Sequence, residues 1–212
     1  MLLLLYFSLL FFPSFQIDQS KAIIIFFSRA GENYDVGTVD VGNTEMIVNY
    51  LTKVTNITSF KINPETAYPV SYNEMLNVAQ NEKSSRARPK IKDPLTDISK
   101  YDTILLGYPI WYGNLPNIVM TQLEMLDFEG KTIYPFNTHE GSKMGSSMSD
   151  IRNSAPKAAV KDGFSLKGTE ARDEDSHGDI REWLADELGI TVNQNNFLKI
   201  SLISILSVLF FL

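Results

Sequence analysis

Apolar and polar positions along the middle of the chain predict strands and helices in turn. A continuous run of branched and aromatic residues, "KAIIIFF" (Lys21 to Phe27), is typical of a strand buried on both faces of a parallel sheet. A later segment, "TEMIVNYLTKV" (Thr44 to Val54), carries apolar residues at helical spacing. The two segments predict a strand that is followed, after a long loop, by an amphipathic helix.

The same alternation continues to residue 188. Further strands are predicted in "SFKI", "TILLGY", "KTIYPF" and near "GFSLKG", and further helices in "YNEMLNVAQNEK", "NIVMTQLEML", "MSDIRNSA" and "GDIREWLADEL". Repeated strand–helix units indicate right-handed βαβ connections and a doubly wound parallel sheet. We interpret the polar, proline-bearing segment 81–97 as a surface connection. The pattern therefore predicts one α/β domain over residues 21–190.

The N-terminal segment 1–20 is predicted to be a leader. Its apolar stretch from Leu2 to Phe12, closed by Pro13, has the length of a signal-peptide core. It lacks a preceding Lys or Arg, and Ser14 and Phe15 make a poor cleavage site, so an uncleaved anchor is the alternative.

The C-terminal segment 191–212 is predicted to be a linker and a hydrophobic tail. Its apolar stretch from Ile200 to Leu212 is shorter than the roughly 20 residues that span a bilayer. A removable GPI-attachment tail, with Asn193 or Asn195 as the attachment residue, would explain this, and a tail anchor or a buried terminal helix are the alternatives. We expect a protein of the secretory pathway, associated with a membrane through its tail, whose domain lies on the luminal or outer side.

Composition excludes several functions for the predicted domain. The chain has a formal net charge of -6 and a pI near 5.0, which argues against a nucleic-acid partner because such a partner needs a clustered basic face. It contains no Cys, so disulfides, thiolate metal sites and thiol catalysis are excluded. We predict no metal site and assign no side chain a catalytic role.

Three loops carry the candidate chemistry. In open parallel sheets, ligands bind beyond the carboxyl ends of the strands, where the winding reverses. The loops after the first, third and fourth predicted strands read "SRAG…GNTE", "PIWYGNLP" and "NTHEGS". Each combines small or turn-forming residues with polar or aromatic groups, which favours a binding rim at this edge.

Taken in this order, the three loops resemble those of the flavodoxin family over roughly residues 21–188. The resemblance implies a five-stranded sheet of order 2-1-3-4-5 and FMN as the cofactor. It also implies a protein that carries electrons between redox partner proteins or to a small electron acceptor. An FMN-dependent NAD(P)H:quinone-type reductase and a membrane-attached module that has lost flavin are the alternatives.

The first loop is expected to hold the phosphate of FMN. Small residues ahead of a helix let backbone amides approach an anion, and the helix N-terminus favours negative charge. Gly31 to Val41 resembles an insertion that could form a small hairpin over this site. A helix cap by Asn43 or Thr44 is the alternative role for those side chains. The resemblance assigns phosphate binding to Ser28, Arg29, Ala30, Asn43 and Thr44.

The other two loops are expected to hold the flavin ring. In the loop after the third strand, Trp111 or Tyr112 should stack on the ring, and the sequence does not distinguish them. In the loop after the fourth strand, hydroxyl and backbone groups should meet the pyrimidine edge, and His139 either tunes flavin charge or orders the loop. The resemblance assigns the ring to Pro109, Ile110, Trp111, Tyr112, Gly113, Asn114, Thr138, His139, Glu140, Gly141 and Ser142.

Overall fold

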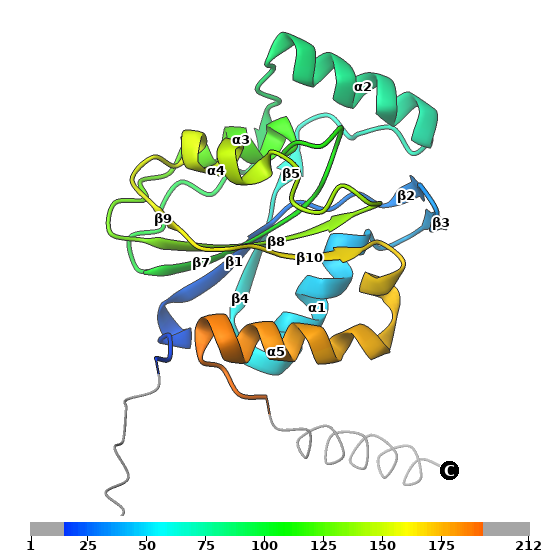
Figure 1. Ribbon diagram of the computed structural model, residues 1–212. Coiled ribbons are helices and arrows are strands. Elements are labelled where there is room, and N and C mark those ends of the chain that lie inside the picture. The colour runs from blue at the N-terminus through cyan, green and yellow to red at the C-terminus, as the bar shows by residue number, and fades with distance from the viewer. Residues whose placement is uncertain (1–14, 193–212) are drawn as a thin grey trace, which may run out of the picture.

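The computed structural model describes residues 15–192, and the apolar stretches of both predicted terminal segments lie outside that range. The described chain forms an α/β sandwich around one parallel sheet (Figure 1). Its strands are β1 (Ala22–Phe26), β4 (Thr58–Lys61), β7 (Thr103–Pro109), β8 (Thr132–His139), β9 (Ala159–Val160) and β10 (Phe164–Lys167). Its longer helices are α1 (Asn43–Thr55), α2 (Tyr72–Ser85), α3 (Asn117–Glu124), α4 (Ser147–Ser154) and α5 (His177–Leu188).

The strand order is β4-β1-β7-β8-β10, with β9 also paired to β8. All of these pairings are parallel, and the order confirms the predicted 2-1-3-4-5 winding. Two short strands share the fifth position of the sheet: β9 pairs with the first residues of β8, and β10 pairs with its last residues. β1 is buried along its whole length, as its unbroken apolar run predicts.

Alternate residues of the central strands face two separate apolar cores. Ile24 and Phe26 pack with residues of α1 and α5, whereas Ile23 and Ile25 pack with residues of α3 and α4. Figure 1 shows α1 and α5 on one face of the sheet, α3 and α4 on the other, and α2 beyond the α3–α4 layer. The two faces of the sheet are thus covered by α1 with α5 and by α3 with α4, whereas α2, in the crossover from β4 to β7, lies outside both cores. The loops are left at the carboxyl edge.

Shorter elements complete the fold. The predicted insertion is a hairpin of β2 (Gly31–Asn33) and β3 (Gly37–Val39), which confirms that interpretation. The segment 81–97 is more structured than predicted, because it holds the last turn of α2 and the strand β6 (Ile91–Lys92), which pairs antiparallel with β5 (Asn63–Pro64). The 3-10 helices are η1 (Gln19–Lys21), η2 (Glu170–Arg172) and η3 (Glu174–Ser176).

The two ends of the described chain meet below the sheet. The amide of Ile17 donates to the carbonyl of Leu188 at 3.0 Å, and the Ile17 side chain joins the core on the α1–α5 face. Ile17, within the predicted leader, therefore contacts the end of α5. Between residues 15 and 192, no helix has both the length and the apolar character needed to cross a bilayer.

Candidate functional site

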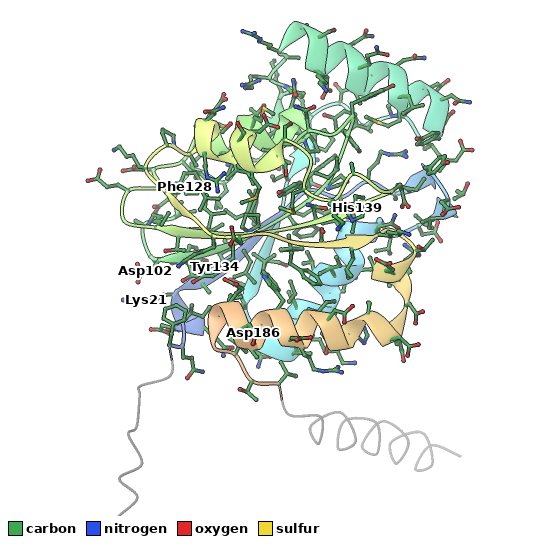
Figure 2. All side chains as sticks on the ribbon, viewed as in Figure 1. Lys21, Asp102, Phe128, Tyr134, His139 and Asp186 are labelled. Carbon is green, nitrogen blue, oxygen red and sulfur yellow. The ribbon has the colours of Figure 1, made fainter. Side chains whose placement is uncertain are left out.

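A pocket of about 350 Å³ lies at the carboxyl edge of the sheet. It collects residues from all three predicted loops, from the hairpin and from α2. Figure 2 shows His139 at this end of the sheet, whereas Lys21 and Asp102, an ion pair at 3.4 Å, lie at the opposite end. The predicted site residues that line the pocket are Ser28, Arg29, Asn43, Thr44, Pro109, Trp111, Tyr112, Thr138, His139 and Glu140.

One end of the pocket is the N-terminus of α1. Its N-cap is Gly42, which has no side chain to accept a hydrogen bond, so the alternative capping role of Asn43 or Thr44 is wrong. The Glu45 amide donates to Ser28 Oγ at 3.1 Å. The amides of Asn43 and Thr44 make no hydrogen bond within residues 15–192. Two donors at a positive helix end are therefore left for an anion.

Gly42 is required by a close approach of two backbones. A Cβ at this position would lie 2.3 Å from Ser28 Oγ and 2.5 Å from the carbonyl oxygen of Arg29. No side chain fits there without moving the loop. The absence of a side chain lets the chain before α1 pack directly on the chain after β1, which draws the helix terminus to the pocket.

Two threonine hydroxyls meet at the same end. Thr44 Oγ1 and Thr138 Oγ1 lie 2.8 Å apart, and both side chains are buried. In such a pair one hydroxyl donates and the other accepts, so one proton remains available to a further acceptor. The pair also ties the first helix to the end of β8, which fixes the distance between two of the loops.

Sequence reasoning missed Arg172, a charged residue beside this site. Its Nη1 donates to the carbonyl of Val41 at 2.8 Å and to Asn43 Oδ1 at 3.2 Å. Arg172 lies in η2, far along the chain from the loop it contacts. A loop contact over such a separation leaves no local pattern in the sequence. The guanidinium adds positive charge beside the free amides and orients the Asn43 side chain.

Arg29 lines the pocket as predicted, and its guanidinium is already held by backbone carbonyls. Its Nη1 donates to the carbonyls of Pro69 at 2.8 Å and Val70 at 3.2 Å, and its Nη2 donates to the carbonyl of Glu32. Burial lowers the pKa of Arg29. The guanidinium lines the pocket but is held by three carbonyls, so it fastens the hairpin to the segment before α2.

The hairpin is also bound to α2. The Glu32 amide donates to the Val70 carbonyl at 2.9 Å, and the Tyr72 amide at the start of α2 donates to Glu32 Oε2 at 2.8 Å. Tyr34 at the hairpin tip and Tyr72 have ring centroids 5.9 Å apart. The inserted hairpin and α2 thus form one side of the pocket together.

α2 supplies an apolar wall that sequence reasoning also missed. Met75 and Ala79 are buried but belong to neither core of the sheet, and with Leu76 they line the pocket. The signal was present in the sequence, because these residues are apolar at helical spacing in an otherwise polar helix. Asn33, Tyr34 and Tyr72 complete the part of the lining that was not predicted.

The aromatic loop is a tight turn. Trp111 and Asn114 exchange backbone hydrogen bonds of 3.1 and 2.9 Å, and φ is +48° at Tyr112 and +75° at Gly113. Positive φ at both central residues is the pattern of a type I′ turn, which glycine adopts freely and tyrosine rarely. Lys83 Nζ, from α2, donates to the Tyr112 carbonyl at 2.8 Å and so holds the unusual residue in place.

Both candidate aromatic residues reach the pocket. Trp111 is half-buried, with its ring at near right angles to Phe27 (centroids 5.3 Å apart) and to Tyr68 (5.1 Å apart). Tyr112 is 43% exposed at the mouth. Trp111 is therefore a fixed wall, whereas Tyr112 depends on the turn for its position.

His139 orders the loop after β8. Its Nδ1 accepts a hydrogen bond from the Gly141 amide at 2.8 Å, so the proton of the neutral ring lies on Nε2. Burial lowers the pKa of His139, which keeps the ring neutral near pH 7. Glu140 Oε1 accepts from the Gly168 amide at 3.1 Å, and burial raises the pKa of Glu140.

Some predicted residues lie near the pocket without lining it. Asn114 is turned away, with its Nδ2 3.4 Å from Asp150 Oδ2, because the turn directs its side chain toward α4. The Gly141 amide is taken by His139. The predicted residues outside the lining are Ala30, Ile110, Gly113, Asn114, Gly141 and Ser142.

Comparison with known proteins gives the following matches. The sequence model of the flavodoxin family matches residues 37–186. A protein from Bacteroides eggerthii DSM 20697, provisionally assigned as a flavoprotein, is 28% identical, with 81% of this chain and 99% of that chain covered and a TM-score of 0.62. A protein from Bacteroides uniformis ATCC 8492 with the same provisional assignment is 23% identical, with 79% and 99% covered and a TM-score of 0.63.

A flavoprotein from Lactobacillus acidophilus NCFM, solved in complex with FMN, shares the fold. It is 17% identical, with 76% of this chain and 97% of that chain covered and a TM-score of 0.54. No curated protein matches the chain.

Proposed function

Because this chain belongs to the flavodoxin family, we propose that it binds FMN in the pocket at the carboxyl edge and carries electrons between partners. When bound, FMN supplies the electron transfer. The observation that carries this proposal is the α1 N-terminus, where the amides of Asn43 and Thr44 are unpaired within the described chain and face the same pocket as Trp111. FMN carries a phosphate at one end and a flat ring at the other, so its site needs free amides at one end of the pocket and an aromatic wall at the other.

The residues present fit the group. The Gly42 contact brings the helix terminus to the pocket, and the Thr44–Thr138 pair leaves one hydroxyl proton to donate. Arg172 adds charge that favours an anion. Ser28 holds the Glu45 amide and so fixes the first turn of α1. Together these residues bind and orient a terminal phosphate through donors that need no rearrangement.

The ring would lie between the aromatic turn and the α2 wall. Trp111 and Tyr112 offer π faces, while Met75, Leu76 and Ala79 offer apolar surface that excludes water. Neutral His139 presents an Nε2–H donor without adding charge, because its Nδ1 is occupied by the Gly141 amide. These side chains bind the ring and set its surroundings, and none of them is proposed as a catalyst.

The electron-carrier role is favoured over a nicotinamide-dependent reductase by the charge of the lining. A nicotinamide dinucleotide brings a pyrophosphate that needs its own donors. Among the residues that line the pocket, Arg29 is the one with a permanent positive charge, and three carbonyls hold it. That arrangement commits three hydrogen bonds of this single lining cation to the protein itself, so few charged donors are left for a second phosphate-bearing molecule.

Mixing the FMN-loaded chain with NADH or NADPH tests this choice. We expect the flavin absorbance to be bleached by dithionite and to stay unchanged with either nicotinamide, apart from the slow reaction of free FMN. Rapid bleaching by NADH or NADPH would support the reductase instead. A chain that takes up no FMN would support the module that has lost flavin.

We also propose that the carrier works at a membrane, with a redox protein or a small electron acceptor as its partner. The proposal is supported by the apolar stretches predicted at both ends of the sequence. Fractionation of cells that express the full chain should place it with membranes. Full-length protein found wholly in the soluble cytosolic fraction would contradict this.

A further inference from the structure

A second cavity, of about 470 Å³, is lined in part by Tyr68, whose ring also contacts Trp111 of the aromatic turn. It is formed by the segment after β5, by α2 and by the segment before β6, and it shares no lining residue with the first pocket. Its size is typical of sites for small molecules. Its apolar walls are Pro64, Ala67, Pro69, Val78 and Pro89.

Three of these wall residues are prolines, whose fixed φ angles stiffen the chain that surrounds the cavity. A rigid wall loses little conformational entropy when a ligand binds against it. The cavity is therefore suited to a small ligand with an apolar body. The polar groups of the cavity decide which charge or polar group that ligand carries.

A half-buried carboxylate that faces this cavity, that of Glu82, has no ion-pair partner in the described chain. Glu82 Oε2 accepts a hydrogen bond from the Tyr68 hydroxyl at 3.2 Å, and no Lys, Arg or His within residues 15–192 forms an ion pair with Glu82. Lys90, which also lines the cavity, pairs with Glu65 at 3.6 Å. Burial raises the pKa of Glu82, as expected for a carboxylate that lacks a counterion.

Tyr68 gives the cavity an aromatic surface. Its hydroxyl is engaged by Glu82, and burial and that carboxylate raise its pKa, so it remains a neutral donor. A neutral aromatic ring beside a carboxylate attracts an organic cation both through the π face and through the charge. The Tyr68 ring also contacts Trp111 and Phe27 in edge-to-face geometry, with centroids 5.1 and 5.6 Å away.

We propose that this second cavity binds a small organic ammonium ion, a primary amine on an apolar or aromatic body, with Glu82 as its counterion. The ammonium group pairs with Glu82 Oε1, the carboxylate oxygen that Tyr68 leaves free, beside the Tyr68 ring, and the body packs on the proline walls. A bare metal ion would leave these apolar walls unused, and an anion would be repelled by Glu82. Because Tyr68 contacts Trp111, occupancy changes the surroundings of a residue in the wall of the first pocket.

The proposal is tested by titrating 2-phenylethylamine into the full chain at pH 8 by calorimetry, with 2-phenylethanol as the uncharged match. We expect saturable binding of the amine and binding of the alcohol that is at least about tenfold weaker, because a desolvated ion pair is lost. This comparison uses the unmodified chain, so it does not depend on the folding of a variant. Equal binding of amine and alcohol, or no saturable binding of the amine, would overturn the proposal.

Two glutamates of α2 make a matched pair of variants. Glu82→Gln keeps an oxygen that can accept from Tyr68 but removes the charge, and we expect it to weaken amine binding at least about tenfold. Glu74→Gln removes the same charge at an exposed position of the same helix and should bind like the unmodified chain. Unchanged binding by Glu82→Gln would show that the carboxylate is not the counterion.

The two tryptophans give a site-specific readout. With ¹⁵N-labelled chain, the indole signal of Trp111 should shift with the same midpoint as the calorimetric titration. The signal of Trp183, which packs in the core on the opposite face of the sheet, should stay fixed. A shift of Trp183 alone would place the amine elsewhere and overturn the proposal. FMN uptake is scored separately by absorbance, so failure of this site and failure of the FMN site are distinguished.

Discussion

Substitution of Gly42 by alanine probes the geometry on which phosphate binding depends. The added Cβ would lie 2.3 Å from Ser28 Oγ and 2.5 Å from the Arg29 carbonyl oxygen, whereas ordinary contacts begin near 3.4 Å. The backbone must therefore separate by about 1 Å, and overpacking of this kind costs about 1 to 3 kcal/mol. Amide–phosphate hydrogen bonds lengthened by that distance fall outside bonding range.

The expected result is a loss of FMN affinity of at least about tenfold, because each hydrogen bond to a charged group contributes about 1.5 to 3 kcal/mol. Quenching of FMN fluorescence during titration with the flavin-free chain measures the affinity, and circular dichroism checks the fold. Gly178→Ala is the matched control. That glycine is in the first turn of α5, with Arg181 Nη2 4.0 Å from the added Cβ, so the change should leave FMN binding unaltered and should not destabilise the fold. Unchanged affinity in Gly42→Ala would refute the assignment of the phosphate to the α1 terminus.

Three further predictions concern residues around the pocket and the core. Lys83→Met removes the donor to the Tyr112 carbonyl and should weaken FMN binding several-fold, whereas Lys83→Arg keeps a donor and should retain most of the affinity. Equal FMN affinity of the unmodified chain and both variants would contradict a role for this contact. His139 has a lowered pKa in the folded chain, so its contribution to stability is present above the unfolded pKa of about 6.5 and is lost as the pH falls through the folded value. Thermal melting curves recorded over a range of pH should show this loss of stability, and the loss should be smaller in His139→Asn. A loss of the same size in the variant would show that other groups cause it. Gln122→Leu leaves the amide and the carbonyl of the half-buried Leu95 without the buried side chain that binds them both. Denaturant unfolding should then show destabilisation by about 2 to 4 kcal/mol, and a loss below about 1 kcal/mol would be the contrary result.

The sheet and the position of the site were predictable because they depend on local pattern. The unbroken apolar run of β1 allows burial on both faces, and regular strand–helix alternation then fixes a parallel sheet whose loops meet at one edge. The inserted hairpin was predictable for the same reason, since its apolar alternation around Gly37 is local.

The remaining features depend on contacts between distant parts of the chain. Arg172 reaches Val41 and Asn43 from η2, and no spacing in the sequence relates them. Arg29 was correctly placed at the pocket, but the carbonyls that hold its guanidinium come from the segment before α2 and from the hairpin. The direction of Asn114 follows from the positive φ angles of the two residues before it. Backbone conformation and long-range hydrogen bonds determine the directions and partners of these three side chains.

The FMN content of the purified chain tests the central claim most directly. The full chain is expressed and purified, its visible spectrum is recorded, and the flavin released on denaturation is identified by chromatography and counted against protein. The account predicts a yellow protein that releases FMN, not FAD, at one molecule per chain, because the pocket offers one helix terminus for one terminal phosphate. A colourless chain that also fails to take up added FMN would contradict it.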